Sequence, residues 1–137
     1  MNRFTDNDYC FACGSRNPIG LHLNVRTDEE GSAVFTWTPK REYQGWSGVL
    51  HGGVISTLLD EAMAYATGSL AEGAATAEIH VSFKKPVSTE RALTVTARVE
   101  ERKRRLMRTS AILVQDGEER AAARAVFVLT AARRSSE

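Results

Sequence analysis

The sequence predicts an α+β fold in which one long buried helix packs against a mostly antiparallel sheet, in the order β-β-α-β-β-β-β. Two observations predict it: there is a single long helical pattern, and runs of alternating apolar and polar residues, typical of strands, lie on both sides of it. The length of 137 residues suits one domain. We therefore expect a single domain over 1–137 that begins with an irregular segment over 1–18.

Two strands are expected before the helix, because apolar residues alternate with polar ones in two successive runs. The apolar residues are Leu21, Leu23 and Val25 in the first run, and Ala33, Phe35 and Trp37 in the second. The turn-like run 28–31 joins the two strands, which predicts a hairpin. Pro39 ends the second strand, since proline cannot donate to a sheet ladder.

The helical pattern runs from about Gly53 to Thr67 and is apolar around most of its circumference, at Val54, Ile55, Leu58, Leu59, Ala62, Met63, Tyr65 and Ala66. Such a helix is buried, so other elements must wrap it. Alternating residues predict four further strands, over 79–83, 93–99, 107–115 and 120–130. In the last, Val126–Leu129 outweigh the helix-forming alanines before them.

Composition excludes several classes of protein. Hydrophobic residues make up 42% and charged residues 26% of the chain, an ordinary balance for a soluble domain. A net charge of +1 argues against a general nucleic-acid binder. No apolar run approaches the roughly 20 residues that span a bilayer, and the first residues do not resemble a signal peptide. We expect a cytoplasmic protein that has neither a nucleic-acid nor a membrane partner.

The helix begins at a pair of glycines, Gly52 and Gly53, directly after His51. Glycine lets other groups approach the backbone closely. The first N–H groups of a helix lack internal partners and form the positive end of its dipole, so they can hold an anion or a developing oxyanion. The alternative is a glycine turn that only permits tight packing, and spacing alone does not decide between the two.

Two adjacent carboxylates, Asp60 and Glu61, lie within this apolar helix, where burial costs free energy unless they are solvated or paired. Asp60 follows Gly53 by two turns, so the two share a face about 10 Å apart. One small carbonyl could not easily contact both, so a shared site would need a second chain to supply one of them. Alternatively, one acid is a satisfied core residue and the other reaches solvent.

The stretch His51–Ala62, with H-G-G followed by an acid nine residues after the histidine, closely resembles the core motif of hotdog-fold acyl-CoA thioesterases of the PaaI-like, phenylacetate-pathway type. The element order also resembles the hotdog fold, in which a sheet wraps a central helix. The resemblance covers essentially the whole chain. The opening run C-F-A-C-G at 10–14, with N-P-I-G-L at 17–21, resembles a subgroup of this family.

The resemblance implies roles for individual residues. The thioester carbonyl would meet the backbone N–H of Gly53, and His51 would support that loop or contact the thioester. Asp60, from the opposing subunit, would act as general base or nucleophile, with the hydroxyl of Thr76 beside it. Glu61 departs from many relatives, which leaves open which acid acts.

Other residues are candidates for contact with the substrate. They are Gly52, Gln44 and Glu61 near the motif, Lys84 and Lys85 after the third strand, and Arg104 and Arg105 at a later hairpin. Basic side chains suit the phosphates of coenzyme A, although most turn charges are simply solvated. Trp46, Met63 and Tyr65 could line an apolar acyl pocket.

Cys10 and Cys13 have the C-x-x-C spacing of zinc ligands. Tetrahedral zinc needs four ligands, so His22, His51 or a partner chain would have to complete a structural site. Two reduced structural thiols are the alternative, and catalysis itself requires no cofactor.

The sequence therefore predicts a homo-oligomeric hydrolase, a dimer or tetramer, that cleaves acyl-CoA to the free acid and coenzyme A. The alternative function is a non-catalytic acyl-CoA-binding or sensor protein of the same fold. The retained Asp60 favours the enzyme, because a pure binder has no need of a buried acid.

Overall fold

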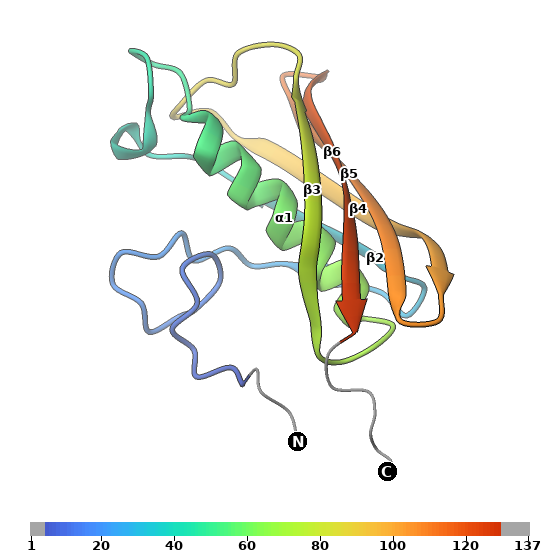
Figure 1. The fold of residues 1–137 in the computed structure, drawn as a ribbon. Helices are drawn as coiled ribbons and strands as arrows, with labels where there is room; N and C mark the ends of the chain where they lie inside the picture. Colours follow the sequence, from blue (N-terminus) through green and yellow to red (C-terminus); the bar gives the residue numbers. More distant parts are fainter. Residues whose placement is uncertain (1–4, 130–137) are drawn as a thin grey trace.

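The computed structural model describes residues 5–129, which form one α-helix packed against a six-stranded antiparallel sheet (Figure 1). Helix α1 spans Gly52–Gly68, and a short 3-10 turn covers Arg41–Tyr43. The strands are β1 (Arg26–Thr27), β2 (Ser32–Trp37), β3 (Ala74–Phe83), β4 (Leu93–Lys103), β5 (Leu106–Gln115) and β6 (Glu118–Leu129). Their order in the sheet is β1-β2-β4-β5-β6-β3. The α+β hotdog architecture predicted from the sequence is confirmed.

Helix α1 supplies the centre of the core, as its apolar circumference predicts. Its buried residues are Ile55, Leu58, Leu59, Ala62, Met63, Ala66 and Thr67. Leu58 and Leu59 are fully buried, and each stabilises the fold by about 1.5–3 kcal/mol relative to an exposed leucine. No helix within residues 5–129 is long and apolar enough to cross a membrane.

The prediction of a first strand at Leu21, Leu23 and Val25 is wrong, although the burial of its leucines is confirmed. Leu21 and Leu23 are buried, as their alternation predicts. However, their N–H groups donate to the carbonyl oxygens of Phe11 (2.8 Å) and Ala12 (2.9 Å), not to β2. Residue 22 has a positive φ of 56°, which interrupts an extended strand. Only Arg26–Thr27 pair with β2, so Leu21 and Leu23 have the N-terminal segment as their hydrogen-bond partner in place of β2.

Strand β3 is longer than predicted and more exposed. It begins at Ala74 instead of residue 79, and it pairs with β6 at the edge of the sheet. The apolar side chains expected to help wrap the helix remain accessible, with Ile79 40% and Phe83 56% exposed. The predicted end of β6 at residue 130 lies outside the described residues, as do residues 1–4 of the irregular segment. Strand β3 therefore has an edge that no other strand within residues 5–129 covers, with Ile79 and Phe83 accessible along it.

Candidate active site and thiol cluster

The loop before α1 is held by hydrogen bonds that fix where the helix begins. The N–H of Leu50 donates to Val87 O (2.7 Å) and the N–H of His51 donates to Tyr43 O (2.9 Å). Within the loop, Gly48 has a φ of 72°, which favours glycine, and its N–H donates to Gln44 Oε1 at 3.0 Å. The Gln44 side chain thus stabilises this loop by accepting a hydrogen bond from Gly48.

His51 is the N-cap of α1. The N–H of Gly53 donates to His51 Nδ1 at 2.8 Å, which satisfies one of the donors that a helix start leaves open. A neutral imidazole that accepts at Nδ1 carries its proton on Nε2. A Cβ on Gly53 would lie 3.1 Å from that same Nδ1, and a Cβ on Gly52 would lie 3.5 Å from the ring of Phe83. The glycine pair therefore lets both the cap and the end of β3 approach the helix closely.

Asp60 lies on the same side of α1 as Gly53 and is bonded to β3. Thr76 Oγ1 donates to Asp60 Oδ1 at 2.8 Å. Thr57, between Gly53 and Asp60 on the helix, donates its hydroxyl to Gly53 O at 3.0 Å. Asp60 is half-buried and Thr76 is exposed, so the acid is both positioned and accessible. The structure brings together the two residues that the resemblance paired.

Glu61 points to a different neighbour, the N-terminal segment. Its Oε2 lies 3.9 Å from Cys10 Sγ, and a carboxylate oxygen of Glu61 and the sulfur atoms of Cys10 and Cys13 all lie within 4.8 Å of one another. Neither histidine proposed from the sequence joins this group. His22 Nε2 lies 2.7 Å from Asn17 O, and His51 caps α1.

Burial dominates the electrostatics of this thiol cluster. Desolvation raises the pKa of Glu61, and the nearby charge of Asp60 adds to that increase. Desolvation also raises the pKa of Cys13 to about 12, although a hydrogen bond with Tyr65 opposes the shift. Burial is also the main cause of the raised pKa of Tyr65. Three acidic groups thus share one half-buried space.

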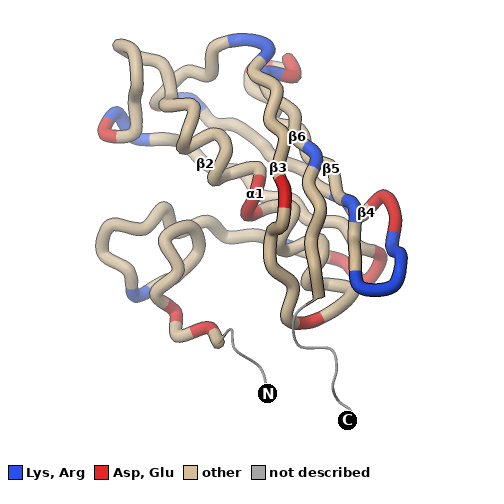
Figure 2. The backbone as a smooth tube through the Cα atoms, viewed as in Figure 1, with Lys and Arg blue, Asp and Glu red and all other residues tan. Residues whose placement is uncertain are grey.

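The candidate phosphate-binding residues lie at two ends of the sheet (Figure 2). Lys84 and Lys85 follow β3 and form ion pairs with Glu119 and, at 2.8 Å, Glu118. Arg104 and Arg105 lie in the turn between β4 and β5. Arg105 donates to Leu129 O (3.2 Å), and Leu129 is paired with the first residue of β3. The ten residues of β3 span roughly 30 Å, so the two basic groups are far apart within one chain.

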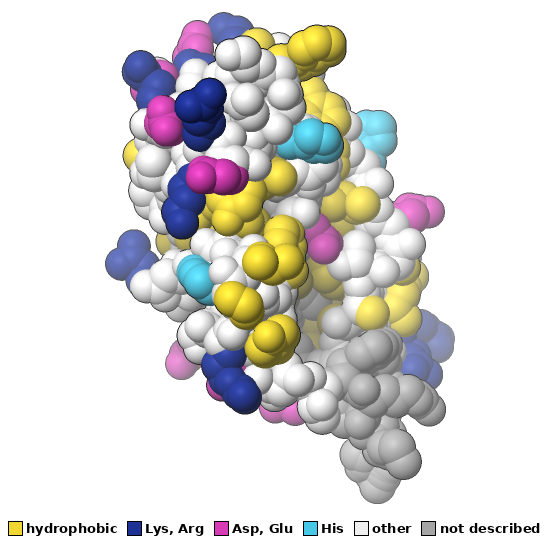
Figure 3. Space-filling model, turned by 90° about the vertical axis from the view of Figure 1, so that its left-hand side faces the viewer, with side chains coloured by type: hydrophobic (Ala, Val, Ile, Leu, Met, Phe, Trp, Pro, Cys, Tyr) yellow, Lys and Arg dark blue, Asp and Glu magenta, His cyan; other side chains and the backbone are white. Residues whose placement is uncertain are grey.

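A hollow of about 400 Å³ lies next to the helix start, lined by Gly45, Trp46, Leu50, His51 and Gly52. Trp46 is 85% exposed at its rim. Hydrophobic side chains gather on this side of the molecule, with an acidic side chain recessed among them (Figure 3). Of the other two residues expected to line an acyl pocket, Met63 is fully buried in the core and Tyr65 meets Cys13 instead.

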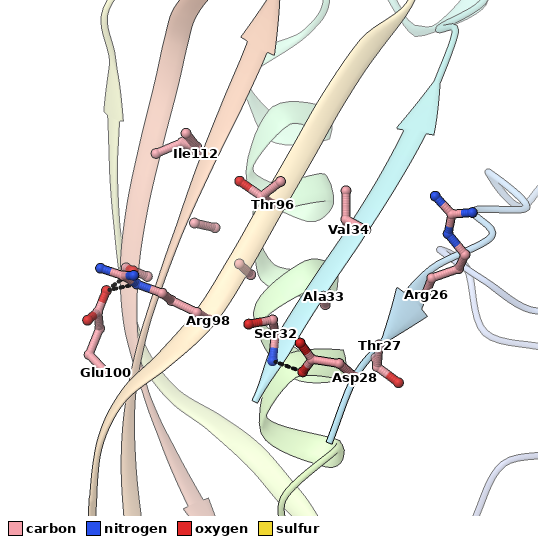
Figure 4. A pocket seen from close by; sticks show the side chains of 13 residues that line it. Arg26, Thr27, Asp28, Ser32, Ala33, Val34, Thr96, Arg98, Glu100 and Ile112 are labelled. Carbon is pink, nitrogen blue, oxygen red and sulfur yellow. Dashed lines mark hydrogen bonds and ion pairs between the residues drawn. The ribbon is translucent and has the colours of Figure 1, made fainter. Parts of the chain in front are cut away.

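A larger hollow, of about 620 Å³, lies over β1, β2, β4 and β5, on the face of the sheet that points away from α1. Val34, Thr96 and Ile112 line it, and α1 lies behind the sheet in this view (Figure 4). The sheet separates it from Asp60 and Gly53, so size alone does not identify the functional site.

The approach of Glu61 to the two thiols is the contact that sequence reasoning missed. A signal for it exists, because Glu61 and Tyr65 are four residues apart and share a helix face. What the sequence cannot show is that the segment 5–25 folds back onto that face.

Known proteins resemble this chain in both sequence and structure. A family model described as the thioesterase superfamily matches residues 47–122, more than half of the chain. No curated protein is significantly similar to it in sequence.

Three solved structures share the fold. A protein described as a thioesterase superfamily protein has a TM-score of 0.78 and 27% identity over 88% of this chain, which spans 60% of that relative's length. A putative thioesterase related to phenylacetic acid degradation, from Ralstonia eutropha, has a TM-score of 0.72 and 27% identity, covering 80% of this chain and 86% of its own. The Escherichia coli PaaI protein from the phenylacetic acid degradation operon has a TM-score of 0.76 and 25% identity, covering 81% of each chain.

Proposed function

Because the chain belongs to the thioesterase superfamily, we propose that it hydrolyses acyl-CoA thioesters to the free acid and coenzyme A, at a site shared between two copies of the chain. The observation that carries the proposal is the pairing of Asp60 with Thr76 (2.8 Å) on the exposed side of α1. A positioned, accessible carboxylate two turns from an exposed helix N-terminus has the parts for water activation and for binding an oxyanion.

A second copy is needed because Gly53 and Asp60 of one helix are about 10 Å apart along its axis. Strand β3 offers a way to bring such groups together. Its start carries Thr76, bonded to Asp60, and its end carries Phe83, whose ring packs against Gly52. If the free edges of two copies pair antiparallel, the start of one strand meets the end of the other. Asp60 of one copy then faces Gly53 of the other.

The exposure of β3 supports this assembly. An edge strand of ten residues with accessible Ile79 and Phe83 is a template for pairing with another chain. The same pairing would move the arginine turn of one copy toward the Lys84–Lys85 end of the other, because Arg105 is anchored beside the start of β3. A single coenzyme A could then meet basic residues from both chains.

In the proposed reaction the carbonyl oxygen of the thioester accepts from the Gly53 N–H. That donor is hydrogen-bonded to His51 Nδ1, so the carbonyl oxygen either displaces Nδ1 or shares the N–H with it. Asp60 Oδ1 accepts from Thr76, which leaves Oδ2 to take a proton from water. The water oxygen forms the new bond to the acyl carbon, the C–S bond breaks, and the thiolate of coenzyme A leaves and takes up the proton.

A Streptococcus mutans protein of the same fold, with a TM-score of 0.75 and 20% identity, was solved bound to acetyl CoA. That complex supports coenzyme A thioesters as the substrate class of this chain. The acyl group is best found with a panel of aliphatic and aromatic acyl-CoA substrates, with release of thiol followed by a thiol-reactive dye. A protein that binds these compounds but releases no thiol would be the non-catalytic binder instead.

Complementation tests the shared site directly. Asp60→Asn removes the base, and Gly53→Pro removes one N–H in the first turn, where proline is tolerated. Each variant alone should be inactive. Co-expressed, they should recover about a quarter of wild-type activity, because half of randomly formed dimers are mixed and each has one intact site. No recovery from a folded mixed dimer would show that each site lies within one chain.

A further inference from the structure

The run C-F-A-C-G at residues 10–14 forms a tight turn that brings the sulfur atoms of Cys10 and Cys13 close together. The N–H groups of Ala12 and Cys13 point at Cys10 Sγ, at 3.3 and 3.5 Å. Such N–H···S contacts suit a sulfur that binds a metal ion, because they place partial positive charge beside it. The turn closes with the Gly14 N–H donating to Cys10 O at 2.9 Å.

The turn leaves no room for a side chain at Gly14. A Cβ at this position would lie 2.3 Å from the Cys10 nitrogen and 2.7 Å from its carbonyl oxygen. Both are backbone atoms, so no side chain could move aside to make room. Glycine at this position therefore lets the backbone of the turn pack closely against Cys10.

A third ligand comes from a different element. Glu61 is one turn before Tyr65 on α1, and its carboxylate faces the thiols, with Oε2 3.9 Å from Cys10 Sγ. All three ligand atoms lie within 4.8 Å of one another. Sulfur and oxygen ligands at tetrahedral angles around zinc are about 3.5–3.8 Å apart, given Zn–S near 2.3 Å and Zn–O near 2.1 Å. The three atoms therefore need to move little to contact one ion.

We propose that Cys10, Cys13 and Glu61 bind one zinc ion, which fastens the N-terminal segment to α1. Two thiolates exclude magnesium and calcium, which prefer oxygen ligands throughout, and favour a tetrahedral zinc site. Tyr65 lies four residues after Glu61, on the same face of α1. A water molecule or the Tyr65 hydroxyl would complete the four ligands of a tetrahedral site. The site lies on the opposite side of the acid pair from Thr76, so it is independent of the proposed hydrolysis.

The metal content of the full chain tests this proposal. The protein is purified under reducing conditions, without chelators and without a metal-affinity tag, and analysed for elements. We expect close to one zinc per chain. Replacement by Co²⁺ should give sulfur-to-cobalt charge-transfer absorption in the near ultraviolet, which reports thiolate ligands. Reduced protein that holds no zinc and shows no such absorption with Co²⁺, or that contains a Cys10–Cys13 disulfide, would overturn the proposal.

Variants locate the ligands. Cys13→Ser should lose the metal, and Glu61→Gln should weaken Zn²⁺ binding at least tenfold in competition with a chromophoric chelator. Asp60→Asn is the matched control, because it removes the neighbouring carboxylate and should leave Zn²⁺ affinity unchanged. Circular dichroism checks folding, and the Glu61→Gln and Asp60→Asn pair decides the result if Cys13→Ser does not fold. Equal affinities in these two variants would refute the assignment of Glu61.

Discussion

Asp60 and Glu61 are neighbours in the sequence, yet they face two different regions of the molecule. Asp60 is held by the Thr76 hydroxyl at the start of the exposed edge strand β3. Glu61 is turned toward Cys10 and Cys13 in the N-terminal segment. The two side chains are about 100° apart around the helix. This is enough to separate a carboxylate that accepts one hydrogen bond from β3 from a carboxylate that faces the two thiols. Adjacent acids in a buried helix need not serve one site.

The two environments also differ in what fixes the carboxylate. On the Asp60 side one hydrogen bond from β3 leaves an oxygen available to solvent and substrate. On the Glu61 side the carboxylate faces two thiols in a half-buried space, where burial raises the pKa of Glu61 and of Cys13. We therefore expect substitutions on the first side to change the rate of hydrolysis, and substitutions on the second to change stability.

The largest expected effect comes from Asp60→Asn, which keeps the shape but removes the carboxylate. General-base catalysis is typically worth about 10²–10⁴-fold, so the rate of thioester hydrolysis should fall by at least that order. Binding of a non-hydrolysable acyl-CoA analogue should persist, because the helix start is unchanged. Glu61→Gln is the control and should be milder. If Asp60→Asn stays active while Glu61→Gln is dead, the roles of the two acids are reversed; if both stay fully active, catalysis by α1 is excluded.

On the other side, Gly14→Ala should lower the free energy of unfolding by about 2–4 kcal/mol, because the new Cβ collides with backbone atoms of Cys10. Gly68→Ala is the matched control: nothing lies within 4 Å of its Cβ, and stability should be unchanged or raised by up to about 1 kcal/mol. Denaturant unfolding measures both. Equal stabilities would show that the tight turn is not needed for the fold.

A smaller effect is expected from Thr76→Val, which removes the hydroxyl that orients Asp60. A hydrogen bond to a charged group is worth about 1.5–3 kcal/mol, so hydrolysis should slow by about tenfold or more, with little change in substrate affinity. Thr76→Ser keeps the hydroxyl and should recover most of the rate. A valine variant as active as wild type would mean that Asp60 needs no positioning.

The smallest expected effect is the dependence of ligand affinity on ionic strength, which should differ between coenzyme A binding and zinc binding. Binding of coenzyme A should weaken as ionic strength rises, because its phosphates meet exposed basic residues whose attraction is screened. Replacing Arg104 and Arg105 with alanine should weaken binding about two- to fivefold, and replacing Lys84 and Lys85 less, since both lysines are already paired with acids. Zinc affinity should barely respond to the same salt. Titrations at low and high ionic strength test all three expectations.

Much of the fold could be predicted because the signals are local. Apolar periodicity located α1 to within a residue at each end, and alternation located β2, β4, β5 and β6 and the second half of β3. The prediction over 21–26 went wrong because alternation reports burial, not the hydrogen-bond partner, and Phe11 and Ala12 supply the carbonyls there. The contact between Asp60 and Thr76 was expected from the family resemblance, whereas the contact between Glu61 and Cys10 depends on where a loop folds back.

The two tryptophans, Trp37 and Trp46, differ in solvent exposure, so their fluorescence should respond differently to a bound ligand. Trp37 donates its indole N–H to Leu21 O and packs against Tyr43 with ring centroids 5.6 Å apart, so its emission is set by the fold. Trp46 stands 85% exposed at the rim of the hollow beside His51. If an acyl group enters that hollow, it should remove water from the indole of Trp46 and shift its fluorescence to shorter wavelength, while the emission of Trp37 should stay constant.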